Sequence, residues 1–197
     1  MLWLALYFPL LPLQVFTRAE TDDAGPTLIS EQNRVLCADP AATETGIKPG
    51  LAVATACALQ PALRIIARDA EKEQAALRRL AHWCYQFSPT VSLKPPDLLL
   101  LEIEGCLHLF GGSAELSKRI NTGLDSLGFS SRQGLGHTPK AAELFARSQI
   151  DSGIADSGVP AYRYALRQIP LSYLNAPSKQ HQLLRDMGFS RLGELLD

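Results

Sequence analysis

The chain has 197 residues, 46% of them hydrophobic and 20% charged, which is enough to bury one good core with a smaller lobe beside it. The formal net charge of -1 excludes a strong general attraction to nucleic acid, so any DNA contact must be local. The four cysteines lack the paired spacing of a zinc site, and we expect them to be buried thiols in a cytoplasmic protein.

The first half of the chain predicts strands and short helices. The uncharged stretch 1–13 has no basic segment before it and contains two prolines, so it predicts a buried strand over 2–8 rather than a signal peptide or a membrane span. A helix is expected from about Leu11 to Ala19, where Pro12 is tolerated only near the first turn. Short strands are expected at 27–30 and 34–38, and the alanine-rich stretch 53–59 is typical of a helix.

The second half contains longer helices around a strand pair. Asp69 can cap a long helix to about Phe87, and apolar residues recur at helical spacing along it as one stripe: Leu77, Leu80, Ala81, Cys84 and Phe87. Strands are expected at 91–94 and 98–103, followed by a helix over 113–127 and a strand over 131–135. The inner face of that helix is formed by Leu116, Ile120, Leu124 and Leu127. Thr138 caps a further helix to about Gln149, and 158–160 is the best boundary before a final small lobe.

The stretch from Pro96 to Gly112 is the most informative part of the chain. The framework around it consists of Ser88-Pro89, Val91, Asp97, Glu102-Ile103 and Gly105, and it closes with Leu-Phe-Gly-Gly at 109–112. This framework resembles the palm motif of Y-family (translesion) DNA polymerases, in which the strand reads Ser-Ile-Asp-Glu-Ala-Tyr-Leu-Asp. The resemblance implies an α+β fold, with a palm at 1–24 and 71–157, an inserted fingers lobe at 25–70 and a helical thumb at 158–197. The family's little-finger domain is not expected after Asp197.

The positions that carry chemistry in this family are changed. Placed without gaps from Ser88, the metal-binding Asp of the family falls on Asp97 and the neighbouring catalytic Glu falls on Leu98. The N-terminal Asp-x-Asp-x-Phe motif falls on Tyr7 and Pro9, and the aromatic gate falls near Pro12. The Tyr-x-x-Arg that grips the triphosphate falls on Pro40 and Thr43.

These losses predict that the chain is not an enzyme. Two-metal phosphoryl transfer needs several anionic oxygens around a pair of magnesium ions, and Asp97 alone cannot supply them. Proline and threonine cannot replace an arginine fork on phosphate. We therefore expect no metal, no nucleotide and no other cofactor.

Within the family, the signature Gly105-x-x-His108-Leu109-Phe110-Gly111-Gly112 together with these losses looks most like the non-catalytic ImuB subfamily. That resemblance implies an adaptor in damage-induced (SOS) mutagenesis and translesion synthesis. Its implied partners are an ImuA-like protein, a separate error-prone polymerase and, through a C-terminal region that this sequence lacks, the sliding clamp. No membrane contact is implied.

The segment from 169 to 197 resembles the helix-hairpin-helix of a Y-family thumb, whose glycine turns bring backbone amides to a DNA phosphate. The first turn, at 174–177, has no glycine, whereas the second half, from Met187 to Leu195, is kept. Weak DNA binding is therefore expected, through Lys179, Arg185, Gly188 and Arg191.

Two other functions are open at this point. The chain could be part of a divergent active polymerase that holds metals with Asp97 plus Glu102 or Glu104. Strand alternation argues against it, because Asp97 is expected to share a face with Leu99, Leu101 and Ile103 and to be opposite the two glutamates. The chain could also be a general nucleic-acid or protein-binding domain unrelated to repair.

Overall fold

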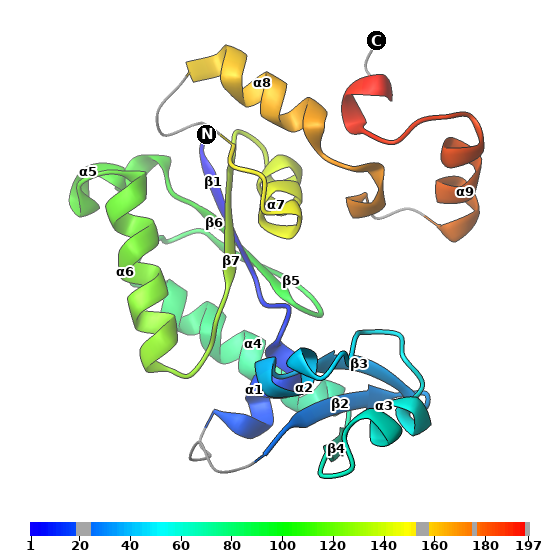
Figure 1. Cartoon of the computed structure of the whole chain (residues 1–197). Coiled ribbons are helices and arrows are strands. Elements are labelled where there is room, and N and C mark those ends of the chain that lie inside the picture. Colours follow the sequence, from blue (N-terminus) through cyan, green and yellow to red (C-terminus); the bar gives the residue numbers. More distant parts are fainter. Residues whose placement is uncertain (19–24, 153–157, 175–176, 196–197) are drawn as a thin grey trace.

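The computed structural model describes residues 1–18, 25–152, 158–174 and 177–195, which form three parts (Figure 1). The palm holds a four-stranded sheet and its helices, the fingers hold a three-stranded sheet, and the thumb is helical. Helices and strands are mixed as the predicted α+β class requires, and that prediction is confirmed. We propose the boundaries 1–24, 25–70, 71–157 and 158–197 for these parts, with the palm divided by the fingers.

The palm sheet has the strand order β5-β6-β1-β7, and all of its neighbouring strands are antiparallel. The strands are β1 (Trp3–Tyr7), β5 (Val91–Lys94), β6 (Leu98–Glu102) and β7 (Arg132–Gly136). The predicted strands are therefore present, and the first strand lies at the centre of the sheet. Side chains alternate along β1, so Leu4 and Leu6 contribute to the large core while Ala5 and Tyr7 lie on the other face.

Two helices cover one face of the palm sheet, α4 (Ala70–Cys84) and α6 (Ser113–Ser126). Asp69 accepts a hydrogen bond from the Lys72 amide and caps α4, and the predicted apolar stripe of this helix is entirely buried. The predicted inner face of α6 is buried except at Leu127, which is 40% exposed because it follows the last residue of the helix. A short turn of helix that the sequence did not predict, η1 (Glu104–Cys106) with α5 (Leu107–Phe110), joins β6 to α6.

Helix α7 (Pro139–Ser148) covers the opposite face of the sheet, and its approach depends on two glycines of β7. A Cβ at Gly134 would lie 2.2 Å from the Ala146 amide nitrogen, and one at Gly136 would lie 2.3 Å from the Ala142 nitrogen. The absence of side chains there lets the helix backbone rest directly on the strand. The Thr138 hydroxyl accepts a hydrogen bond from the Ala141 amide, so the predicted cap is confirmed.

The fingers follow α1 (Leu11–Thr17) and contain β2 (Thr27–Glu31), β3 (Arg34–Ala38) and β4 (Arg64–Ala67) in the order β3-β2-β4. Helices α2 (Pro40–Glu44) and α3 (Val53–Leu59) pack beside this sheet. Arg68 joins the fingers to the palm, because it forms two 2.8 Å hydrogen bonds to the buried Glu73 carboxylate and one of 3.0 Å to Glu31. Cys57 on α3 is exposed and Cys106 is only half-buried, so the prediction that every cysteine is buried is wrong for these two residues.

The thumb consists of α8 (Gly158–Gln168), η2 (Leu171–Tyr173), α9 (Ser178–Asp186) and η3 (Leu192–Leu195). Tyr162, Ala165 and Ile169 pack against α7 and anchor the thumb on the palm. The Glu194 carboxylate accepts hydrogen bonds from the amides of Ser190 and Arg191, which lower its pKa and fix the last turn. In the described ranges, no helix combines the length and the apolar character needed to cross a membrane.

Candidate functional site: the palm cleft

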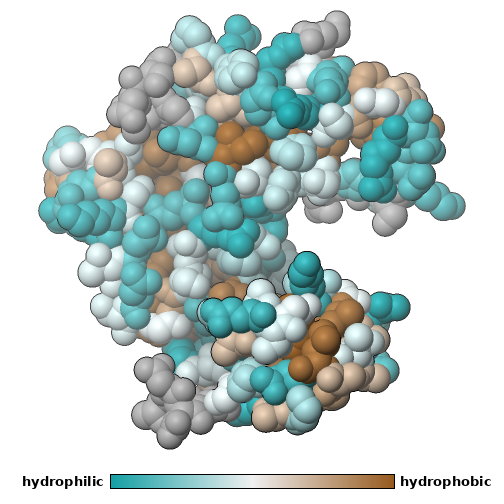
Figure 2. Space-filling model, viewed as in Figure 1, coloured by the Kyte–Doolittle hydropathy of each residue, from teal (hydrophilic) through white to brown (hydrophobic). Residues whose placement is uncertain are grey.

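A cleft of about 750 Å³ lies where the end of β1, the β5–β6 turn and helix α7 meet the thumb. Figure 2 shows the wider hollow between palm, fingers and thumb. The cleft is lined mainly by charged and aromatic side chains, namely Tyr7, Lys94, Pro95, Pro96, Asp97, Arg132, Lys140, Glu143, Arg147, Ser172 and Tyr173. Four of these residues are basic and two are acidic, so the cleft is positive although the chain as a whole is not.

Arg147 is at the centre of the contacts in this cleft. Its Nη2 donates a hydrogen bond to Asp97 Oδ1 at 2.9 Å, and its Nε donates to Glu143 Oε1 at 3.1 Å. Its guanidinium carbon lies 4.4 Å from the centroid of the Tyr7 ring, within the range of a cation–π contact. Lys140 Nζ donates to the second oxygen of Glu143 at 3.0 Å. One cation thus joins the two palm positions where the family resemblance places metal ligands.

The electrostatics of the cleft follow from this arrangement. Burial raises the pKa of the Tyr7 hydroxyl, and the Asp97 carboxylate raises it further, while the Arg147 charge opposes both. Burial alone would lower the pKa of the Arg147 guanidinium, but its hydrogen bond and attraction to Asp97 raise it overall. Tyr7 is therefore neutral at physiological pH and cannot act as an anionic ligand there.

The predicted orientation of Asp97 is wrong. Asp97 precedes the first residue of β6, so its side chain is not bound by the alternation of the strand. It contacts Arg147 of α7 and lies with Tyr7 in the cleft, whereas Leu99, Leu101 and Ile103 belong to the core under α4 and α6.

Leu98, at the predicted position of the catalytic Glu, is completely buried. It pairs with Tyr7 across the two strands and packs between the sheet and α7, against Ala5 and Leu100 of the strands and Ala142 and Ala146 of the helix. Pro9 and Pro12 lie in the turn after β1 and in the first turn of α1, outside the cleft lining. Pro40 and Thr43 lie on α2, where Thr43 Oγ1 donates to the Asp39 carbonyl, and neither reaches the cleft.

The pair of carboxylates proposed for a divergent polymerase is not brought together. Asp97 and Glu102 are at opposite ends of β6, about 16 Å apart along a strand that rises ~3.3 Å per residue. Glu104 forms a 2.6 Å ion pair with the N-terminal ammonium group at that far end. In the part of the chain that the structure describes, no three His, Cys, Asp or Glu side chains gather as a metal site would need. A cation in contact with the one cleft aspartate does not fit a two-magnesium centre.

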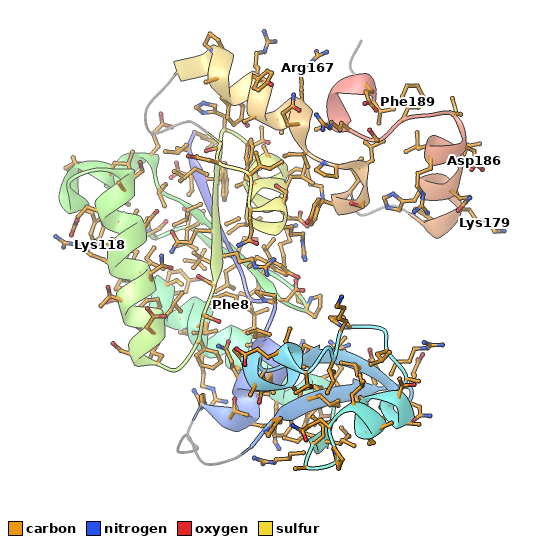
Figure 3. All side chains as sticks on the ribbon, viewed as in Figure 1. Phe8, Lys118, Arg167, Lys179, Asp186 and Phe189 are labelled. Atoms are coloured by element: carbon orange, nitrogen blue, oxygen red, sulfur yellow. The ribbon has the colours of Figure 1, made fainter. Side chains whose placement is uncertain are left out.

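The predicted DNA contacts lie on the thumb, away from the palm cleft. Figure 3 shows Lys179 on α9, and Arg185 follows on the same helix, where its Nη2 donates to Gln182 Oε1. Gly188, with a φ of 88°, ends that helix in the left-handed conformation that favours glycine. Arg191 donates a hydrogen bond to the Gln168 side chain. Asn175 and Ala176, in the expected first turn, lie outside the described residues.

Sequence reasoning missed the basic residues of the palm cleft: Lys94, Arg132, Lys140 and Arg147. A signal was available, because Lys140, Glu143 and Arg147 recur at a spacing that places them on one face of the predicted helix over 138–149. What the sequence could not supply was the contact between Arg147 and Asp97, which are 50 residues apart.

Comparison with known proteins finds a family model and relatives that are polymerases or polymerase-like proteins. A family model described as impB/mucB/samB matches residues 16–147. The chain is 33% identical over 151 residues to Protein ImuB of Caulobacter vibrioides, a match that covers 77% of this chain and 32% of that protein. It is 25% identical over 163 residues to DNA polymerase IV of Pelotomaculum thermopropionicum, covering 82% of this chain and 40% of the relative. The chain thus spans about a third of the length of the ImuB relative.

Solved structures show the same fold. A ternary complex of Dbh DNA polymerase matches with a TM-score of 0.77 at 16% identity, over 100% of this chain and 60% of that one. DinB from Sulfolobus solfataricus matches with a TM-score of 0.71 at 16% identity, again over 100% and 60%. The predicted palm with its inserted fingers lobe and helical thumb is the fold that these polymerases share with the present chain.

Proposed function

The chain belongs to the impB/mucB/samB family of Y-family polymerase-like proteins, and from that premise we propose that it is a catalytically inactive adaptor in damage-induced translesion synthesis. The family and its ImuB relative place the chain among DNA-damage-related, polymerase-like proteins. Inactivity, the adaptor role and a cytoplasmic site of action are the parts that we propose.

The observation that carries the proposal is the contact of Arg147 with both Asp97 and Tyr7. A polymerase needs divalent cations at this place, held by several carboxylates. Here a guanidinium supplies the positive charge, Tyr7 supplies a ring in place of an anion, and buried Leu98 closes the position beside Asp97. The cation is part of the protein, so it balances Asp97 without leaving coordination sites for a nucleotide.

A polymerase-shaped chain without a metal centre still has a use as a scaffold. We propose that it holds an ImuA-like protein and a separate error-prone polymerase near damaged DNA. The sliding clamp would be bound through a further region, because the ImuB relative is about three times as long as the matched segment. Direct binding of the purified chain to these partners, whose genes we expect beside its own, would support this role.

Primer extension tests the inactivity. The purified chain, free of contaminating polymerase, is incubated with primer-template DNA, nucleotides and magnesium or manganese, beside Dbh DNA polymerase as a positive control. We expect no extension, because the cleft does not hold a metal pair. Template-directed extension that disappears in the Asp97→Ala variant would show that the proposal is wrong.

DNA binding by the chain is proposed to be weak and local. We expect a Kd of about 10⁻⁴ to 10⁻⁶ M at physiological salt, which is the range of non-specific complexes. Thumb residues Lys179, Arg185, Gly188 and Arg191 remain the proposed contacts, and cleft residues Lys94 and Arg132 are added to them. Titration of labelled DNA at several salt concentrations should show a slope that falls by about one unit for each lysine or arginine replaced by alanine. Nanomolar binding that resists salt would contradict this estimate.

A further inference from the structure

We infer that the groove formed by the end of α4, α5 and the outer side of α6 is a docking surface for a protein partner. The segment that it fits carries a large apolar side chain flanked by carboxylates. The groove has a volume of about 560 Å³ and belongs to the helix layer on the far side of the palm sheet from the palm cleft. We call it the back groove, and its lining consists of Trp83, Gln86, Phe87, Phe110, Glu115, Lys118, Arg119, Thr122, Gly123 and Ser126.

The floor of the back groove is aromatic. The Trp83 and Phe87 rings meet nearly edge to face with their centroids 5.0 Å apart, and the Phe110 ring centroid lies 5.8 Å from that of Phe87. Phe87 is buried, whereas Trp83 and Phe110 are only partly covered by the protein. Partly covered tryptophan and phenylalanine rings beside an open groove are the kind of surface that an apolar side chain of a partner can complete.

Gly123 gives the groove its shape. A Cβ at this position would lie 2.3 Å from Cζ2 of Trp83, so any other residue would push the indole ring away from α6. Glycine in the interior of a helix costs about 1 kcal/mol relative to alanine. The glycine therefore allows the indole ring to lie against the helix backbone and form part of the aromatic floor of the groove.

The charges of the back groove favour an acidic segment. Lys118 is exposed and points away from the palm sheet (Figure 3), and among the described residues it has no ion-pair partner. Arg119 Nε is 3.4 Å from Glu115 Oε1 in an exposed pair, and the Arg119 guanidinium lies 5.8 Å from the Phe110 ring centroid. The lining thus contains two cations and one carboxylate, and that carboxylate is already in contact with Arg119.

A nucleic acid fits this surface less well than a protein does. Binding along a phosphate backbone needs a row of cations with stacking rings beside it, and the lining contains only two cations. The volume of the groove and its aromatic floor suit one or two apolar side chains. This inference does not depend on the proposed inactivity, because the back groove and the palm cleft share no residue.

Two synthetic peptides test the inference with the whole chain labelled for NMR. Both peptides carry one phenylalanine and one leucine, and they differ only in having aspartates or lysines around them. The reporters are the Trp83 indole N–H and the Gly123 amide. We expect the acidic peptide to shift both signals and to bind about tenfold more tightly than the basic one, since two exposed charge contacts are gained.

Charge reversal provides the matched control. Lys118→Glu should weaken binding of the acidic peptide by about fivefold. Lys48→Glu makes the same charge reversal at an exposed site on the fingers and should leave the affinity for the acidic peptide unchanged. Absence of shifts at Trp83 and Gly123, or equal affinity for the two peptides, would overturn the inference. So would a short single-stranded DNA that shifts these signals more strongly than the acidic peptide does.

Discussion

Replacing Arg147 by methionine removes the guanidinium from the palm cleft but keeps most of the unbranched stem that packs there. Asp97 then loses its 2.9 Å hydrogen bond, Glu143 loses its bond to Nε, and the Tyr7 ring loses the cation above it. We expect a clear loss of stability, because a partly covered carboxylate is left without its partner.

The magnitude follows from burial. The side chains of Arg147 and Asp97 are 24% and 23% exposed, so this ion pair is intermediate between an exposed and a buried pair. An exposed pair contributes up to about 1 kcal/mol, and disruption of a buried pair costs about 3–5 kcal/mol. We therefore expect the ion pair to account for about 2 kcal/mol and the ring contact for roughly 0.5–1 kcal/mol more. In a double-mutant cycle with Asp97→Asn, the coupling energy should be about 1–2 kcal/mol.

Urea unfolding followed by circular dichroism measures these values, with an unchanged m-value as the check that only stability has changed. Arg119→Met is the matched control, because Arg119 also has a glutamate and a phenylalanine ring nearby, but with longer and more exposed contacts. That variant should lose less than about 1 kcal/mol. Equal losses in the two variants, or no coupling between Arg147 and Asp97, would refute the view that the guanidinium replaces a metal as the cation of the cleft.

Three other outcomes follow from the structure. Leu98→Glu should destabilise the fold by several kcal/mol and restore no activity, since it places a charge in a fully buried position. Tyr7→Asp should cost less, because the Arg147 guanidinium lies beside the new carboxylate. Equal unfolding free energies for the two variants would contradict this. Burial raises the pKa of the Cys84 thiol to about 12 from its usual 9.0. The stability that the buried neutral thiol contributes is therefore complete below pH 9 and is lost as the pH rises through 12. In a thiol-labelling assay of the native protein, exposed Cys57 should react and buried Cys84 should not. Gly134→Ala should cost about 1–3 kcal/mol in urea unfolding because its Cβ would meet the backbone of α7, while Gly105→Ala, with no atom within 4 Å of its new Cβ, should cost much less.

Much of the fold could be predicted because its signals are local. The stripe of α4 and its Asp69 cap, or Thr138 before Pro139, lie within a few residues of the elements that they define. The fingers show where this fails. Helix α2 has only five residues and depends on the Asp39 side chain that also accepts a bond from Thr27, and β4 is held by parallel pairing with β2, which lies more than thirty residues earlier.

The candidate site also has a part that could be predicted from the sequence and a part that could not. The replacement of carboxylates at Tyr7 and Leu98 is visible in the sequence, because each position is defined by its own strand. The compensating Arg147 could not be assigned from the sequence, since its contact with Asp97 requires α7 to lie close on β7. The orientation of Asp97 was missed for a related reason, because strand alternation does not hold one residue before a strand begins.

The central place of β1 in the palm sheet has a consequence for synthesis on the ribosome. Its two neighbours, β6 and β7, begin only at Leu98 and Arg132, so β1 is made well before either of the strands that pair with it. At a synthesis rate of about 5–20 residues per second, the apolar N-terminal segment waits on the order of ten seconds for both neighbours. During that time its leucines are available to chaperones, and the helices of the back layer can begin to form before the sheet that they will cover.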